Sequence, residues 1–272
     1  MENINRKIIG FDEISQKSSL PIEKVEKFLD LIKRSMEPVS KRISVLENGT
    51  KRYYQVERRG IGILNTPYGK FWEYNFAIDD QWQKYSVLVK SDIDEELLIP
   101  AFKNKESLIL RTDSGCETGQ LYKDLTCECG EQLHLAMKTI SESAEGMIVS
   151  IPSQDGRGMG LTFKLATLWV QEVLNLDTVE SATLLAPGGV IDVRTYSGVI
   201  CILKFFNIQE SCVINLATNN PKKAEVFIEN GYIIGSYTPI VIKPNGYTKI
   251  HLLAKQKFLG HKNLVEDHEG GE

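Results

Sequence analysis

The sequence predicts an α/β (α+β) core that follows a small N-terminal helix–hairpin appendage. Residues 1–58 carry a helical apolar repeat and then a hairpin signal, residues 59–100 are rich in β-forming residues, and residues 101–260 alternate strand patterns with helical patterns. Such alternation is typical of a sheet that is covered by helices. We therefore expect an appendage over residues 1–58, a core over residues 59–260 and a separate tail over residues 261–272.

The appendage is predicted from one amphipathic repeat and one turn. Apolar residues recur at helical spacing in Pro21–Met36, and the shorter segment Phe11–Lys17 can pair with that helix. Glu47-Asn48-Gly49 then favours a type I′ turn in a hairpin over Ile43–Val56. This order fits a winged helix, whose wing would carry the basic residues Lys51, Arg52, Arg58 and Arg59. It also fits a packing or dimerisation appendage, which we favour because short helix–hairpin patterns are common.

The elements of the core follow from alternation, helical spacing and capping residues. The predicted strands are Gly60–Leu64, Phe71–Ala77, Tyr85–Lys90, Ser107–Arg111, Gly146–Ile151 and Val213–Leu216. Helices are predicted over Gly130–Ala144 and Leu161–Leu174, and a third begins at Asn220-Pro221 and ends at Asn230-Gly231. Strands that run into helix N-termini form anion sites in this class of fold. The acidic stretch Glu266–Glu272 is expected to be disordered.

Composition and length exclude several classes of protein. The chain has 272 residues, of which 42% are hydrophobic and 25% are charged, as is ordinary for a globular cytoplasmic protein. A formal net charge of −4 argues against a general nucleic-acid binder or a protein that binds anionic membranes. No stretch reaches 18 apolar residues and the first residues lack a signal-peptide pattern, so we expect a cytoplasmic protein without a membrane segment.

Three of the five cysteines lie within fourteen residues, in the pattern Cys116-x10-Cys127-x-Cys129. This clustering fits a thiolate metal site better than a disulfide framework. Zinc prefers sulfur and nitrogen ligands, and three protein ligands would leave a fourth position for a catalytic water. A structural zinc that is completed by His134 is the alternative, and the spacing alone does not separate the two. The distant Cys201 and Cys212 are expected to be buried side chains.

Several short motifs of the chain, taken together, carry more information about its relationships than any one of them. The zinc segment is Cys116-Glu117-Thr118-Gly119 followed by Cys127-Glu128-Cys129-Gly130-Glu131-Gln132-Leu133. The others are Gln154-Asp155-Gly156-Arg157-Gly158-Met159-Gly160, Asp177-Thr178-Val179-Glu180, Asp192-Val193-Arg194 and Thr218-Asn219-Asn220-Pro221-Lys222-Lys223. At these segments the sequence resembles the GTP cyclohydrolase II family, which carries out the first step of riboflavin synthesis. The resemblance runs from Thr66-Pro67-Tyr68-Gly69 to about Gly260 and does not include residues 1–58.

The resemblance implies a GTP cyclohydrolase II-like core and a zinc-dependent hydrolase that opens the ring of GTP. The three cysteines would hold a catalytic zinc whose water attacks C8 of the guanine, and the products would be formate, pyrophosphate and a diamino-ribosylamino-pyrimidinone phosphate. Asp192 and Arg194 would be catalytic, as acid/base partner and as nucleophile or stabiliser in pyrophosphate release. The implied nucleotide-binding residues are Arg111, Ser114, Gln132, Asp155, Gly156, Arg157, Thr178, Thr218 and Lys223. The resemblance also implies Mg²⁺ with the triphosphate and a homodimer.

The chain departs from the family pattern at several positions around the expected substrate. The family has arginine, glutamate and arginine where this chain has Thr126, Gly115 and Ser153. The family's essential tyrosine falls at Leu168 or at Trp169, depending on the direction of counting. Fewer arginines weaken the neutralisation of a triphosphate, and the loss of a phenol removes a proton donor. Two alternatives therefore stay open: a paralogue that hydrolyses another nucleotide or base, such as a uracil nucleotide, and a non-catalytic nucleotide-sensing regulator.

Overall fold

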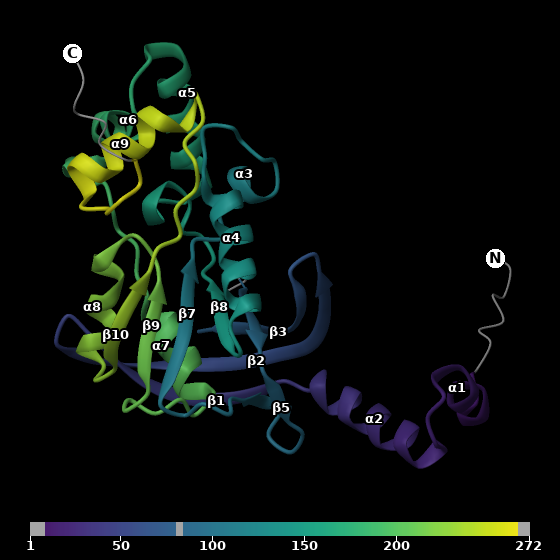
Figure 1. Ribbon diagram of the computed structural model, residues 1–272. Helices are drawn as coiled ribbons and strands as arrows, with labels where there is room; N and C mark the ends of the chain where they lie inside the picture. The colour runs from purple at the N-terminus through teal and green to yellow at the C-terminus, as the bar shows by residue number, and fades with distance from the viewer. Residues whose placement is uncertain (1–8, 80–83, 266–272) are drawn as a thin grey trace, which may run out of the picture.

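An eight-stranded sheet is the centre of the computed structural model, which describes residues 9–79 and 84–265. The strands are β1 Val39–Glu47, β2 Thr50–Thr66, β3 Gly69–Ile78, β4 Tyr85–Lys90, β7 Ser107–Asp113, β8 Gly146–Ser150, β9 Val213–Ala217 and β10 Ile233–Thr238. Their order in the sheet is β1-β2-β3-β4-β8-β7-β9-β10 (Figure 1). The pairs from β1 to β4, and β4 with β8, are antiparallel, whereas β8, β7, β9 and β10 run parallel. A separate small sheet pairs β5 Asp92–Asp94 with β6 Ile99–Ala101.

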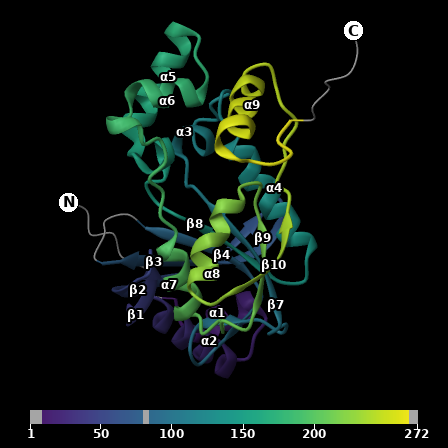
Figure 2. The same cartoon turned by 90° about the vertical axis from the view of Figure 1, so that its left-hand side faces the viewer.

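Helices cover the sheet and continue beyond one end of its parallel half. They are α1 Phe11–Ser18, α2 Ile22–Ser35, α3 Glu117–Gln120, α4 Cys129–Glu142, α5 Gly160–Leu174, α6 Thr178–Leu185, α7 Ser197–Phe205, α8 Glu225–Glu229 and α9 Thr248–Leu259. Short 3₁₀ helices span Asp155–Gly158, Pro187–Gly189 and Pro221–Ala224. Figures 1 and 2 both show α5, α6 and α9 gathered at the same end of the molecule, beyond β7 and β9. In parallel sheets, ligands bind outside the carboxyl ends of the strands, so this end is the expected place for a site.

Two apolar clusters hold the helices against the sheet. The larger one surrounds α7, which is buried along nearly its whole length and whose Phe205 packs edge-to-face on Phe76 of β3 with ring centroids 5.1 Å apart. The smaller one joins α4 to the sheet, through Ile140 against Ile148 and Phe71. This second cluster fixes the helix that begins at Cys129, and with it one edge of the site.

The N-terminal hairpin is part of the main sheet. β2 crosses residue 58, the expected boundary between appendage and core, and its pairing with β3 shifts register between Arg58 and Gly60. A register shift of this kind lets a long strand bend instead of ending. Within the expected appendage, the helical pair α1 and α2 is the part that lies outside the sheet, and among the residues of these two helices only Val25 is buried (Figure 1).

The basic residues of the expected wing do not form a free cationic stripe. The guanidinium of Arg58 is buried and donates hydrogen bonds to the carbonyl oxygens of Leu98 and Glu37. Arg52 and Arg59 form ion pairs with glutamates of the same hairpin, Glu47 and Glu57 respectively. These contacts give no support to a winged helix that binds DNA.

The mixed α/β class is confirmed. The predicted helices over residues 130–144 and 161–174 correspond to α4 and α5, whereas the helix expected after Asn220 forms in two pieces, a 3₁₀ turn and then α8. α6, α7, α9 and β10 were not predicted. Within the described residues no helix has the length and apolar character needed to cross a bilayer. The expected disordered stretch Glu266–Glu272 lies outside the described residues.

Candidate active site

The three clustered cysteines come together just past the carboxyl end of β7. Cys116 directly precedes the short helix α3, Cys127 lies in the following loop, and Cys129 is the first residue of α4. Their sulfur atoms all lie within 4.8 Å of one another, and the Sγ atoms of Cys116 and Cys127 are 3.5 Å apart. Tetrahedral Zn–S bonds of about 2.3 Å separate sulfur atoms by about 3.8 Å. The donor set and its spacing therefore fit a zinc ion.

Two glycines permit this approach of the two cysteine loops. A Cβ on Gly119 would lie 2.6 Å from the sulfur of Cys127, and a Cβ on Gly130 would lie 2.4 Å from the carbonyl oxygen of Gly119. The glycines that accompany the cysteines in the sequence are thus required by the packing. His134, the alternative fourth ligand, is exposed and lies against the ring of Tyr68. It does not join the metal-binding group that the described residues form.

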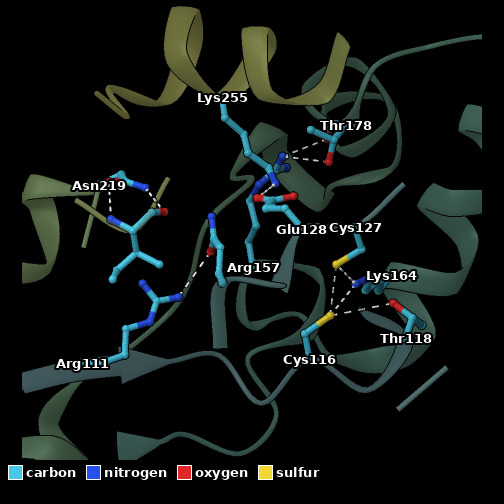
Figure 3. Close-up of polar contacts among 12 residues, drawn as sticks. Arg111, Cys116, Thr118, Cys127, Glu128, Arg157, Lys164, Thr178, Asn219 and Lys255 are labelled. Atoms are coloured by element: carbon cyan, nitrogen blue, oxygen red, sulfur yellow. Dashed lines mark hydrogen bonds and ion pairs between the residues drawn. The ribbon is translucent and has the colours of Figure 1, made fainter. Parts of the chain in front are cut away.

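Lys164 is the neighbour of the thiolates that sequence reasoning missed. It lies on α5, and its ammonium nitrogen is 2.7 Å from the sulfur of Cys116 and 3.5 Å from that of Cys127 (Figure 3). In the sequence it is one lysine on an amphipathic helix. Its one sequence signal was its place ten residues after Gln154, in the helix that follows the glycine-rich turn.

A pocket of about 1160 Å³, including its open mouth, joins the cysteines to most of the other predicted site residues. The predicted residues that line it are Arg111, Ser114, Cys116, Cys127, Cys129, Gln132, Asp155, Gly156, Arg157, Thr178, Arg194, Thr218 and Lys223. Six cationic side chains face three carboxylates in the lining, so the pocket favours an anionic ligand. Of the predicted residues, Asp192 alone is not part of the lining.

The glycine-rich turn positions Arg157. Gly156 and Arg157 both have left-handed backbone angles, with φ of 56° and 59°. The guanidinium of Arg157 donates to the carbonyl oxygen and the hydroxyl of Thr178 at 3.0 and 3.1 Å. Thr178 begins α6, whose first turn is closed by a capping box of Asp177 and Glu180. Two segments that are distant in sequence are thereby fixed side by side at the pocket wall.

Asp192 and Arg194 form a two-pronged ion pair. The Nε of Arg194 donates to Oδ1 of Asp192 at 2.9 Å, and a second guanidinium nitrogen contacts Oδ2. Burial alone would raise the pKa of Asp192, but the hydrogen bonds and charge of Arg194 outweigh it and hold this pKa below its ordinary value. Arg194 lines the pocket, whereas its partner Asp192 does not. A Cβ on Gly158 would lie 2.9 Å from the amide nitrogen of Arg194, so the glycine-rich turn packs against this pair.

Two buried cations are added by Lys223, in the 3₁₀ turn that follows β9, and by Arg111, near the end of β7. Lys223 donates to the carbonyl oxygen of Thr112 at 2.8 Å, and Arg111 donates to the carbonyl oxygen of Ala217 and to Gln132 at 3.1 and 3.2 Å. Burial, followed by the charges of Arg111 and Arg194, holds the pKa of Lys223 well below its ordinary value. A bound anion would lower the electrostatic repulsion among these neighbouring cations.

Two of the positions at which this chain departs from the family pattern lie in the wall of the pocket. Leu168 lines the pocket, whereas the side chain of Trp169 is 75% exposed, so the position that faces the ligand is occupied by leucine. Thr126 also lines the pocket, and its hydroxyl donates to Asp124 at 2.8 Å. The wall at these two positions is therefore less polar and less basic than the resemblance leads one to expect.

The C-terminal helix α9 forms one side of the pocket, which no sequence motif had indicated. His251, Lys255 and Leu259 of α9 line the pocket, together with His261. The Lys255 ammonium pairs with the carboxylate of Glu128 (Figure 3). In the sequence, Glu128 stands between Cys127 and Cys129. Both charged groups are largely buried, with 19% and 6% of their side chains exposed. More than a hundred residues separate this lysine from its partner, so local patterns in the sequence cannot reveal the contact.

Replacing Glu128 with glutamine should lower the free energy of unfolding by about 3 kcal/mol, because it leaves the Lys255 charge buried without a partner. Urea denaturation at a fixed zinc concentration measures the change. The double variant Glu128→Gln/Lys255→Met should recover part of the loss. Glu142→Gln, which breaks the exposed pair with Lys138, is the matched control and should cost less than about 1 kcal/mol. Equal losses in the two glutamine variants would contradict the assigned burial.

Fold and site together define a class of protein: a mixed α/β protein with a three-cysteine cluster that fits a metal ion, beside a cationic pocket. The chain belongs to the GTP cyclohydrolase II family, whose sequence model matches residues 53–239.

Two similar proteins named GTP cyclohydrolase-2 are matched over nearly their whole length. That of Streptomyces coelicolor is 30% identical over 223 residues, covering 82% of this chain and 94% of the relative. That of Picrophilus torridus is 32% identical over 198 residues, covering 73% of this chain and 94% of the relative. A longer relative, the riboflavin biosynthesis protein RibBA of Parabacteroides distasonis, is 32% identical over 218 residues; the match covers 80% of this chain and 47% of the relative.

Proposed function

We propose that this protein is a zinc-dependent hydrolase that opens the imidazole ring of GTP and releases formate and pyrophosphate. The observation that carries the proposal is the meeting of three cysteine sulfurs with a pocket lined by six cations. Such charge favours a triphosphate, and a zinc-bound water next to the base would supply the nucleophile for a ring-opening hydrolysis. Membership in the family and the names of the relatives support the same reaction.

The residues divide into two groups by their proposed roles, at the metal and at the phosphates. A zinc ion on the three thiolates would supply a Lewis acid and a water of lowered pKa. Arg157, Lys223 and Arg111 are proposed to bind the phosphates, because their guanidinium and ammonium groups line the pocket. Arg194 is proposed to act on the α-phosphate in pyrophosphate release, with Asp192 holding its guanidinium in place. Mg²⁺ would accompany the triphosphate.

The proposal is tested by incubating zinc-loaded protein with GTP and Mg²⁺ while the absorbance of the purine ring is followed. Loss of the purine spectrum is expected, and protein stripped of metal by a chelator should leave the spectrum unchanged. ATP is the matched control nucleotide, since it carries the same triphosphate on another base. Turnover of GTP that survives removal of the metal would contradict the proposed zinc chemistry.

A second candidate, a hydrolase for another nucleotide or base, is favoured by one observation. Leu168 and Thr126 occupy the pocket wall where the family pattern has a tyrosine and an arginine. A less basic and less polar wall suits a ligand with fewer phosphates or a smaller ring. A panel that includes UTP, UMP and uracil separates the two candidates, because the first predicts turnover of GTP alone.

We also infer a homodimer, on the basis of an exposed apolar stripe on α5. Leu165, Trp169 and Val173 recur every four residues and are 51%, 75% and 65% exposed. Exposed apolar patches of this kind on folded proteins commonly mark interfaces. The neighbouring Leu184 of α6 is 60% exposed and extends the surface.

Replacing Trp169 with glutamate should weaken self-association at least about tenfold, because an interface that buries tryptophan then buries a charge. Sedimentation over a range of protein concentrations measures the dissociation constant. Ile228→Glu on α8, where the isoleucine is 61% exposed, is the matched control and should leave association unchanged. A wild-type protein that sediments as a monomer at every concentration would contradict the inference.

A further inference from the structure

A zinc ion on the three cysteine thiolates would form a centre with a net negative charge. Three cysteine thiolates and one divalent zinc ion leave a net charge of −1, and the Asp155 carboxylate nearby is itself buried. A buried charge without a partner is costly. A cation that lies against the sulfurs would offset this charge.

Most of the pocket cations are occupied by oxygen acceptors. Lys255 pairs with Glu128 and Arg194 pairs with Asp192. Arg157, Arg111 and Lys223 each donate to carbonyl oxygens. The ammonium group of Lys164 is instead directed at sulfur, between Cys116 and Cys127 (Figure 3).

The position of Lys164 is fixed by the backbone around it. α5 begins directly after the glycine-rich turn, and a Cβ on Gly156 would lie 3.1 Å from the amide nitrogen of Lys164. The turn that carries Arg157 is therefore packed against the segment that carries Lys164. A substitution in either segment should therefore shift the position of the other.

Resting on the proposed zinc site, we infer that Lys164 is a positioning residue: its ammonium donates to the Cys116 thiolate and balances the negative charge of the three-thiolate zinc centre. Donors of this kind outside the ligand shell orient the ligands and tune the metal. The role is distinct from binding the phosphates, because the nitrogen is already within hydrogen-bond distance of sulfur.

The test measures zinc affinity by competition with a chromophoric chelator, in Lys164→Met, Lys164→Arg and Lys138→Met. Lys164→Met removes the charge and the donor and should weaken zinc binding about 10- to 100-fold. Lys164→Arg keeps the charge and should restore most of the affinity. Lys138 lies on the exposed face of α4 and is the matched control, whose variant should bind zinc as the wild type does.

Cobalt substitution supplies a readout that a merely structural role would not change. Loss of a hydrogen bond to thiolate raises the energy of the sulfur lone pair, so the thiolate-to-cobalt charge-transfer band of Lys164→Met should move to longer wavelength. Unchanged zinc affinity and an unmoved band in Lys164→Met would overturn the inference, as would an equal loss of affinity in Lys164→Arg.

Both measurements are made without nucleotide, so they stand apart from the proposed reaction. Weak zinc binding in Lys164→Met together with no turnover of GTP by the wild type would support the role of Lys164 and reject the proposed substrate. Full zinc affinity in Lys164→Met, together with turnover of GTP by the wild-type protein, would reject the role of Lys164 and support the proposed substrate.

Discussion

Replacing Cys127 with alanine is expected to remove the bound zinc and to lower GTP turnover at least about 1000-fold, which corresponds to about 4 kcal/mol in activation free energy. Cys127 is one of three sulfurs that lie within 4.8 Å of one another, and two thiolates hold zinc far less firmly than three. Zinc content by elemental analysis and the rate of ring opening are the two measurements.

Cys212→Ala is the matched control for this loss. Cys212 is also buried, but it lies in the large apolar cluster and not in the metal-binding group. Its variant should keep one zinc per chain and nearly the wild-type rate. A Cys127→Ala protein that retains both zinc and turnover would reject the assigned metal site.

Replacing Arg194 with alanine should lower kcat/KM for GTP by about 100- to 1000-fold. The variant lacks the preorganised guanidinium that would stabilise the negative charge developing on the phosphate in the transition state. The Arg194→Lys variant keeps the positive charge, but its ammonium group cannot make the two-pronged contact with Asp192, so it should restore little of the rate. Zinc content should stay at the wild-type level, since Arg194 is not a ligand.

The control for Arg194 is Arg52→Ala, in which an arginine that is 63% exposed and paired with Glu47 is removed from the distant hairpin. It should turn over GTP at the wild-type rate. Separate measurements of formate and pyrophosphate locate the affected step. If Arg194→Ala releases pyrophosphate as fast as the wild type, the proposed role at the phosphate is wrong.

The sequence predicted those elements that carry a local signal. α4 and α5 have long helical repeats, and β7, β8 and β9 are runs of β-forming residues, so all five appear where they were expected. α7 was missed because it is buried nearly all round and so lacks a polar face. The break at residue 58 was expected from a change of pattern, but the strand continues there through a register shift.

Site residues were predictable where they stand in motifs. The three cysteines are close in sequence, and the structure brings their sulfurs together as the spacing suggested. Lys164 and Lys255 were missed for the opposite reason: their partners lie 48 and 127 residues away, and a lysine on a helix is ordinarily exposed. Only the packing of α5 and α9 over the cysteine loops identifies them.

We expect the zinc-loaded protein to hydrolyse GTP at both ends of the molecule, the imidazole ring and the triphosphate. The simultaneous measurement of formate and pyrophosphate released from GTP tests this expectation. Both products should appear, in equal amounts and only with zinc bound. Protein that carries one zinc per chain and releases neither product from GTP would show that the proposed function is wrong.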